Sequence, residues 1–239
     1  MDSLQAIISD IRVFLYSGLQ NLPLSIAGTF LLIGLFTANY AMLFFLVGLL
    51  VSVPFVNFFL DQLLLLILPD SIRSKSSDVC RIVVPFLTDS SESYHIISQW
   101  TAMVSFFFGY MIHNSVKLLT KDPEPATTIE LTDKDLKEIN QKASYRKTQA
   151  IVSMISIVIV TSITLIMRYR TGCENIIGFL IGTVGYGTAG YFWYVLLSII
   201  GEDRLSDLFG VANRLLPPSA IVNRPVACLP VPASQLPKK

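Results

Sequence analysis

The chain has 239 residues, of which 52% are hydrophobic and only 15% are charged, and its mean hydropathy is +0.59. This apolar content exceeds what one soluble core of this size needs, so an ordinary soluble domain is excluded. The formal net charge of +1 creates no global field that would attract nucleic acid, which we exclude as a partner. Three scattered cysteines, Cys80, Cys173 and Cys228, argue against a disulfide framework and against a C-x-x-C metal or redox site.

Residues 1–22 predict an amphipathic helix that lies in the membrane interface. Met1 is followed by Asp2 rather than by the basic region of a secretory signal, so we expect the segment to be retained. Apolar residues recur at helical spacing, namely Leu4, Ile7, Ile8, Ile11, Phe14 and Leu15. The alternative is a lead-in helix that packs on the rest of the bundle.

Residues 23–68 predict a transmembrane hairpin, because Asp61 is the only charged residue among them. As one helix, residues 24–68 would be about 67 Å long, roughly twice the thickness of a hydrocarbon core. It must therefore fold back, and residues 37–40 are its most polar break. Pro54 can kink or restart a helix, so residues 55–68 are a candidate third piece.

Three further segments, residues 96–116, 149–167 and 175–200, are free of Asp, Glu, Lys and Arg. Each has the roughly 20 residues that a spanning helix requires. In lipid every backbone N–H and C=O must be paired internally, which favours helices over open strands. We therefore expect an all-α polytopic transmembrane helical bundle of about five spans, with six as the alternative.

No complete catalytic or metal-binding motif is visible, so we expect no cofactor and no metal. The sequence Gly185–Gly190 matches the dinucleotide pattern G-x-G-x-x-G, but it lies inside a charge-free span with no preceding strand. His95 and His113 would lie about 27 Å apart on one helix, so they cannot share a site. Asp61 has no acidic counterpart in another span, which favours placement at the interface over ion transport.

The last predicted span carries a seam of small residues that permits close helix packing. We assign four residues to this seam: Gly178, Gly182, Gly185 and Ala189. Packing explains this pattern better than ligand binding does.

The distribution of basic residues predicts the sidedness of the chain. With five spans, the amino terminus, the loop of residues 69–95 and the turn of residues 168–174 share one face. The loop of residues 117–148 and the tail of residues 201–239 share the other face, which holds 12 of the 18 Lys and Arg residues. Positive-inside reasoning places that loop and the carboxyl terminus in the cytoplasm. The expected location is a viral internal membrane or a cellular organelle membrane.

The loop of residues 117–148 ends in a predicted helix. Thr132 and Asp135 resemble a capping box, and no helix breaker follows before Gln149. We expect a single helix that runs from water into the membrane, with its charged half solvated or facing a partner protein.

The tail, residues 201–239, predicts a short amphipathic helix and then an extended, proline-rich segment. The helical pattern stops at Pro217 and Pro218, and the segment that follows cannot build a core of its own. Extended segments bind by covering the surface of another protein. Candidate partner-binding residues of the tail are Leu205, Leu208, Phe209, Pro217, Pro218, Pro225, Pro230 and Pro232. A tail without a partner is the alternative.

The order of two features in the chain resembles the type 2 phosphatidic acid phosphatase and haloperoxidase superfamily. The first feature is a loop that ends in Ser93-Tyr94-His95 before an apolar helix. The second is the turn of residues 168–174 before a glycine-rich helix. The resemblance covers residues 54–200 and implies that three loop motifs meet on one membrane face. It implies a phosphate site that contains His95, Arg73 and Arg170.

The chain departs from that family at several positions. Leu66 and Ser74 stand where the first motif has lysine and proline, and Glu92-Ser93-Tyr94-His95 replaces Pro-Ser-Gly-His. The third motif of the family, which supplies the histidine nucleophile, aligns with Arg170 and Glu174. This chain therefore lacks that histidine. Phosphoryl transfer through a covalent histidine needs that imidazole, so the resemblance implies a degenerate relative.

The stretch from Arg204 to Ala220 is similar to tails of internal-membrane, capsid-associated proteins of large icosahedral double-stranded DNA viruses. We therefore expect a non-enzymatic structural or assembly component of a larger assembly, whose charged loop and tail anchor partner proteins to the bilayer. The alternatives are a membrane lipid phosphatase and an accessory subunit of a membrane complex such as a respiratory assembly.

Overall fold

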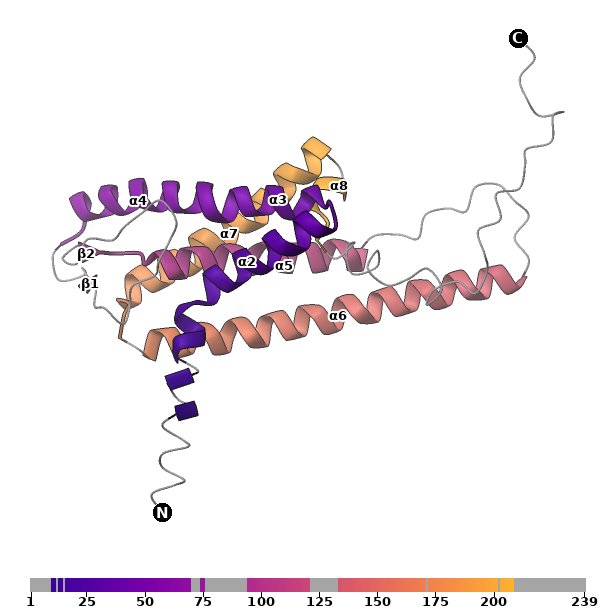
Figure 1. Ribbon diagram of the computed structural model, residues 1–239, viewed down its shortest axis with the longest axis horizontal. Coiled ribbons are helices and arrows are strands. Elements are labelled where there is room, and N and C mark those ends of the chain that lie inside the picture. Colours follow the sequence, from indigo (N-terminus) through magenta and orange to yellow (C-terminus); the bar gives the residue numbers. More distant parts are fainter. Residues whose placement is uncertain are drawn as a thin grey trace, which may run out of the picture. The chain divides into compact units, whose positions relative to one another are not determined.

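The computed structural model describes residues 10–11, 13–14, 16–69, 74–75, 94–120, 133–170, 172–201 and 203–208. These residues are almost entirely helical (Figure 1). In chain order the elements are α2 (Leu22–Phe36), α3 (Tyr40–Val47), the π-helical turn η1 (Gly48–Ser52), α4 (Val53–Ile67), β1 (Ser74–Lys75), β2 (Tyr94–His95), α5 (Gln99–Thr120), α6 (Asp133–Arg170), α7 (Ile176–Gly201) and α8 (Asp203–Ser206). Most of the predicted loops, and the tail from Phe209 onward, lie outside the described residues.

The chain reverses between α2 and α3, at the polar break where the sequence predicts a fold-back. Ala38 adopts a positive φ of 50°, and the side chain of Asn39 accepts a hydrogen bond of 2.9 Å from the amide of Ala41. This bond caps the first turn of α3, so the reversal has a local cause. The chain therefore folds back where the sequence predicted, while the crossing of a membrane by both arms of the hairpin stays a prediction.

Pro54 does not begin a separate piece, because α3, η1 and α4 form one continuous helix of 28 residues from Tyr40 to Ile67. The five-residue π-turn ends two residues before this proline and adapts the backbone to its missing N–H. On the neighbouring helix, Trp193 Nε1 donates to the carbonyl oxygen of Phe44 at 3.3 Å. A Cβ on Gly48 would lie 2.6 Å from that nitrogen, so glycine leaves room for the indole. The sixth span that residues 55–68 would have added is not a separate element.

Within the described residues, three helices are long and apolar enough to cross a membrane. They are Tyr40–Ile67, Lys147–Arg170 and Ile176–Gly201, while Leu22–Phe36 is a shorter apolar helix. At 15 residues, α2 is about 22 Å long, which is less than the hydrocarbon thickness. The chain therefore has the character of a helical membrane protein.

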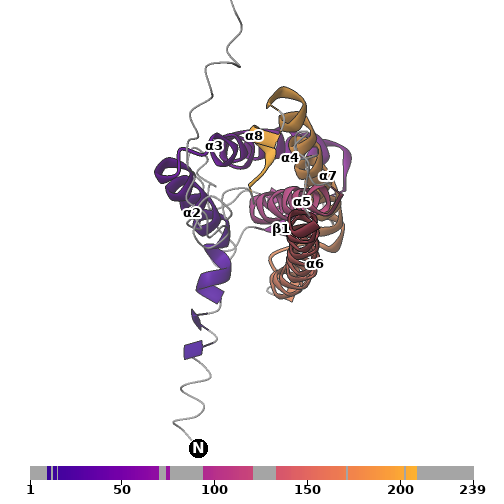
Figure 2. The same ribbon diagram turned by 90° about the vertical axis from the view of Figure 1, so that its right-hand side faces the viewer.

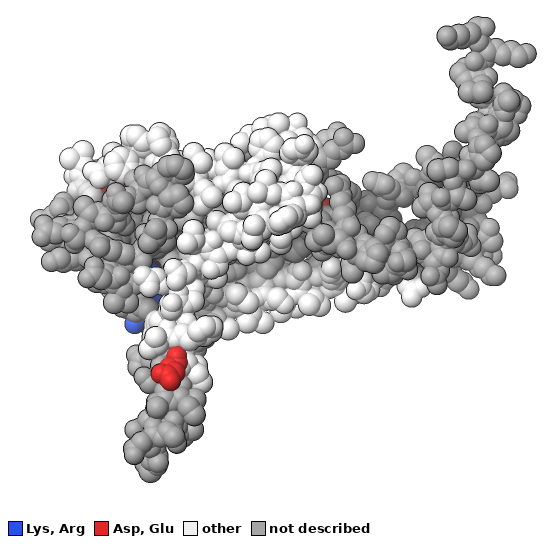
Figure 3. Space-filling model, viewed as in Figure 1, with Lys and Arg blue, Asp and Glu red and all other residues white. Residues whose placement is uncertain are grey.

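The central helix of the bundle is α5, which contacts α2, α4, α6 and α7 (Figure 2). Its buried side chains include several polar ones, namely Thr101, Ser105, Asn114 and Ser115. The surrounding helices present apolar side chains outward, with Phe36 87% exposed and Leu66 84% exposed. In the view of Figure 3 almost all of the described surface is uncharged. This distribution suits a bundle whose outer helices face lipid and shield a more polar central helix.

Small residues bring the backbones of α5 and α7 into direct contact. A Cβ on Gly178 would lie 1.7 Å from the carbonyl oxygen of Ile96, and one on Gly190 would lie 2.1 Å from that of Phe106. Gly182 faces Thr101 in the same seam.

The seam predicted from the sequence therefore needs a correction. Gly178 and Gly182 belong to it, but Gly185 meets nothing within 4 Å and Ala189 is exposed. Gly190 continues the seam instead, because it lies eight residues, or about two helical turns, beyond Gly182.

An unbroken helix of 38 residues forms α6, which confirms the predicted run from the charged segment into the apolar one. Buried or half-buried residues recur along it at intervals of three or four, at Ala150, Met154, Ile157, Thr161, Leu165 and Arg168. This stripe is the line along which α6 packs on α5.

Candidate functional site

The strongest concentration of buried polar groups lies where α5 begins, α6 ends and α7 begins. Glu174, in the turn before α7, accepts hydrogen bonds at Oε1 from the hydroxyls of Ser98 and Thr101. The same oxygen lies 3.6 Å from Nε of Arg168, and both charged side chains are buried. The guanidinium of Arg168 also lies over the indole of Trp100, 5.1 Å from the ring centre. We call these five residues the Glu174 cluster.

Local sequence signals explain why two helices start at this cluster. Ser98 caps α5, since its hydroxyl oxygen accepts from the amide of Thr101 at 3.2 Å. Asn175 caps α7 in the same way, accepting from the amide of Ile177 at 3.0 Å. Gly172, with a φ of 72°, provides the reversal between α6 and α7. Both helix amino termini therefore lie beside the carboxylate of Glu174 and favour its negative charge.

A second polar group lies beside this cluster, between α4 and α5. Asp61 Oδ1 accepts from the amides of Ile96 and Ile97 at 2.8 and 3.1 Å. Asn57 Nδ2 donates to Oε1 of Gln99 at 2.9 Å. The carboxylate of Asp61 thus holds the turn before α5, which accounts for a charged residue late in an apolar helix.

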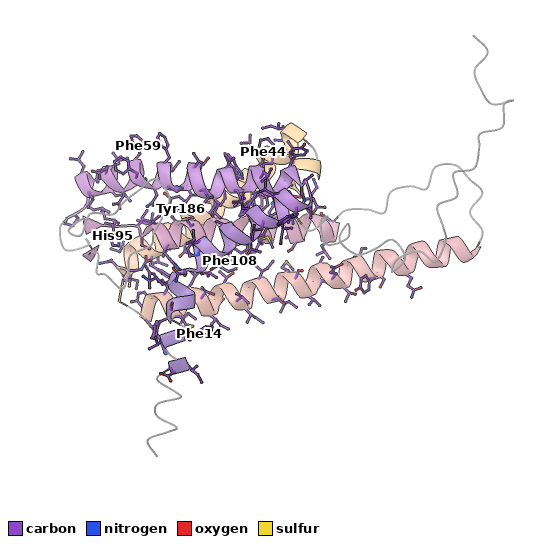
Figure 4. All side chains as sticks on the ribbon, in the orientation of Figure 1. Phe14, Phe44, Phe59, His95, Phe108 and Tyr186 are labelled. Atoms are coloured by element: carbon purple, nitrogen blue, oxygen red, sulfur yellow. The ribbon has the colours of Figure 1, made fainter. Side chains whose placement is uncertain are left out.

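The residues predicted to form a phosphate site do not assemble into one among the described residues. His95 is half-buried at the end of β2, where it pairs with Ser74 of β1 (Figure 4). Arg170 is exposed, and Arg73 lies outside the described residues. The arginine that reaches Glu174 is Arg168, two residues earlier.

Sequence reasoning missed Arg168, Ser98, Thr101 and Trp100. One available signal was the position of Arg168 on the buried stripe of α6, at helical spacing from Thr161 and Thr164. Arg170 falls off that stripe. The contribution of Ser98 and Thr101 depends on how α5 and α7 pack, which spacing along the chain does not reveal.

The scattered cysteines argued against a disulfide framework, but Cys173 is disulfide-bonded. Cys80 and Cys228, the other two cysteines of the chain, lie outside the described residues. The bonded cysteine directly precedes Glu174, so the disulfide constrains the turn that carries the buried carboxylate. An odd number of cysteines therefore did not exclude one bridge.

The Glu174 cluster binds its own carboxylate rather than presenting an open catalytic site. Arginine, two hydroxyls and two helix amino termini form a strongly anion-binding environment, and Glu174 occupies it. The cysteine next to Glu174, Cys173, is disulfide-bonded and is therefore not a free thiol nucleophile. Among the described residues no group of three or more His, Cys, Asp and Glu could hold a metal ion.

The start of the tail lies against the middle of α5. The hydroxyl of Tyr110 donates to the carbonyl oxygen of Ser206 at 2.8 Å, and Leu208 is only 4% exposed. Tyr194 of α7 packs against the rings of Tyr110 and His113, with centroid distances of 5.2 and 4.5 Å. We call this arrangement the tail clamp.

The tail clamp includes some of the predicted partner-binding residues. Leu205 is half-buried and Leu208 is buried, so these two contribute to the bundle. The remaining tail residues of that prediction, from Phe209 onward, lie outside the described residues.

No family model, no curated protein and no solved structure matches this chain.

Proposed function

We propose that this chain is a non-enzymatic, multi-pass membrane protein that anchors partner proteins to a bilayer through its charged segment and its proline-rich tail. The observation that carries the proposal is the tail clamp, in which Tyr110 and Ser206 hold the root of the tail against α5. An anchor needs such a fixed root, because a partner bound to a loosely attached tail would not be held at a defined place on the membrane.

The proposal includes five spans, formed by α2, the helix Tyr40–Ile67, α5, α6 and α7. In this arrangement α5, which is too polar to face lipid alone, crosses the membrane surrounded by the other helices. The charged part of α6 and the tail then lie on the cytoplasmic side. We propose a structural role in a larger assembly, with attachment of a viral capsid to an internal membrane as one form of it.

The rival function is a lipid phosphatase that uses the anion-binding groups around Arg168. Those groups suit a phosphate, but the carboxylate of Glu174 already lies among them, and the neighbouring Cys173 is disulfide-bonded. A carboxylate buried in this way must be displaced before a second anion can bind, and its displacement would take the negative charge away from the buried guanidinium of Arg168. Anchoring is therefore the better-supported function.

Two measurements on the same preparations separate these functions. Deleting residues 217–239 should abolish co-purification of the partner from native membranes while insertion into the membrane is retained. Purified protein in lipid should not hydrolyse phosphatidic acid. Turnover that His95→Ala abolishes, together with unchanged co-purification after the deletion, would favour the phosphatase.

A further inference from the structure

The helical segment before α2 bends where it joins that helix, and Trp100 holds the bend. The described members of residues 10–20 are helical, and α2 follows after Asn21. Pro23 has no amide hydrogen, so the carbonyl oxygen of Leu19 lacks the donor that a continuous helix would supply. The indole Nε1 of Trp100 donates to this oxygen at 2.8 Å. A carbonyl left free by a proline is thus satisfied by a neighbouring helix. We call residues 10–20 the N-terminal arm.

The root of the N-terminal arm packs on the bundle, and its outer part does not. Leu19 packs against the core cluster that contains Trp100. Ile11, Val13 and Phe14 are exposed, and Phe14, labelled in Figure 4, is 77% exposed. Exposed apolar side chains that lie this close together mark a surface that binds another molecule or a membrane.

The N-terminal arm leaves the bundle at one end of the apolar part of α6. Arg168 is the first charged residue after that apolar run, and its guanidinium lies 5.1 Å from the ring centre of Trp100. The same indole bonds to the root of the arm. Figures 1 and 2 show the arm, drawn in indigo before α2, pointing across the direction in which α5 and α6 run. If α6 crosses a bilayer, the arm is therefore placed in the plane of the membrane interface.

We propose that Trp100 fixes the N-terminal arm in the membrane interface, where Ile11 and Phe14 insert among the lipids of the leaflet next to the Glu174 cluster. These two side chains are three residues apart and share one side of the helix. The apolar side chains of an in-plane helix enter the boundary between headgroups and acyl chains. The inference rests on the proposed insertion of the bundle into a bilayer, and it needs no tail partner.

The surface around the bend is suited to lipid. No charged residue lies between Arg12 and Asp61, so the inner part of the arm and α2 offer no charged group to a partner protein. Leu24, on the α2 side of the bend, is exposed as well, which extends the apolar surface toward the outer face of the bundle. Asp10 is exposed at the outer described end of the arm, and an in-plane arm lets its carboxylate reach water.

The test is photocrosslinking of the full-length chain in lipid nanodiscs. Phe14 is replaced by the photoreactive residue p-benzoylphenylalanine, and mass spectrometry identifies the adducts that form on irradiation. In a second preparation the same residue replaces Leu32, an exposed residue of α2, and reports insertion of the bundle itself. Two matched variants, Trp100→Phe and Trp193→Phe, each remove one indole donor to a helix carbonyl. Circular dichroism would verify that both variants keep their helical content.

A third variant tests the bend without changing the indole. Pro23→Ala gives the carbonyl of Leu19 a donor within its own helix, so it should straighten the segment. We expect it to lose most of the lipid adducts at position 14 and to keep those at position 32. Trp100→Phe should give the same result, and Trp193→Phe should keep the adducts at both positions.

Four results would overturn the proposal. They are lipid adducts at position 32 alone, crosslinks from position 14 to protein, unchanged adducts at position 14 in both Trp100→Phe and Pro23→Ala, and equal losses in the two tryptophan variants. Absence of lipid adducts at both positions would overturn it together with the membrane insertion on which it rests.

Discussion

Nε of Arg168 lies 3.6 Å from Oε1 of Glu174, and this ion pair is buried at the junction of α5, α6 and α7. A buried pair is costly to desolvate and is stable only when further hydrogen bonds complete it. Ser98 and Thr101 provide those bonds to the carboxylate, and Trp100 packs against the guanidinium. The pair therefore joins three helices that are distant in sequence.

Breaking this pair on one side should strongly destabilise the bundle. Glu174→Gln keeps the size of the side chain but removes the negative charge that faces the buried guanidinium of Arg168, at an expected cost of about 3–5 kcal/mol. Thermal unfolding in detergent would measure the loss. The double variant Glu174→Gln with Arg168→Met removes both charges and should recover much of it. If Glu174→Gln unfolded at the same temperature as the wild type, the ion pair would contribute nothing to the stability of the fold.

The corrected packing seam predicts opposite results for two glycines on α7. Gly190→Ala places a methyl group against the backbone of Phe106 and should cost about 1–3 kcal/mol through overpacking. Gly185→Ala adds a methyl group where nothing lies within 4 Å, so it should be neutral or slightly stabilising. The unfolding temperatures of the two variants in the same detergent provide the comparison. Equal destabilisation would contradict the assignment of the seam.

Removing the hydroxyl of Tyr110 should loosen the tail clamp. Tyr110→Phe leaves the carbonyl of Ser206 without this bond, at a cost of about 1–3 kcal/mol. Limited proteolysis should then cut more rapidly near α8 while the rest of the bundle stays resistant. Tyr40→Phe, which removes a hydroxyl from a side chain that is 64% exposed, is the matched control. Identical cleavage rates in both variants would argue against the clamp.

The disulfide of Cys173 makes an independent prediction about sidedness. Disulfides persist in oxidising compartments, and this cysteine lies at the end of the bundle opposite the charged part of α6. In sealed vesicles of known orientation, a membrane-impermeant reductant should reduce it only from the non-cytoplasmic side. Reduction from the cytoplasmic side would reverse the proposed topology.

Local signals in the sequence predicted several elements correctly. The break before Asn39 depends on a capping group that acts within a few residues, and α6 begins at Asp133, close to where the sequence predicted a helix start. The continuity of the helix through Pro54 was missed, because a π-turn and a neighbouring tryptophan accommodate the proline. Periodicity also did not resolve the seam on α7, where small residues occur on both faces of one helix.

The Glu174 cluster is harder to anticipate, because its members come from three segments. Arg168 and Arg170 are chemically equivalent in the sequence, and only the packing of α6 on α5 decides which one is buried. Ser98 and Thr101 have ordinary roles at a helix start, and their bonds to Glu174 arise from the close approach of α5 and α7. Tertiary packing therefore determines the partners.

Hydrogen–deuterium exchange of the tail tests the anchoring role most directly. Amides of residues 217–239 would be measured in native membranes and in the purified chain under the same conditions. Anchoring predicts slow exchange in the native membranes, where a partner covers the segment, and fast exchange in the purified chain. Equally fast exchange in both preparations would contradict it.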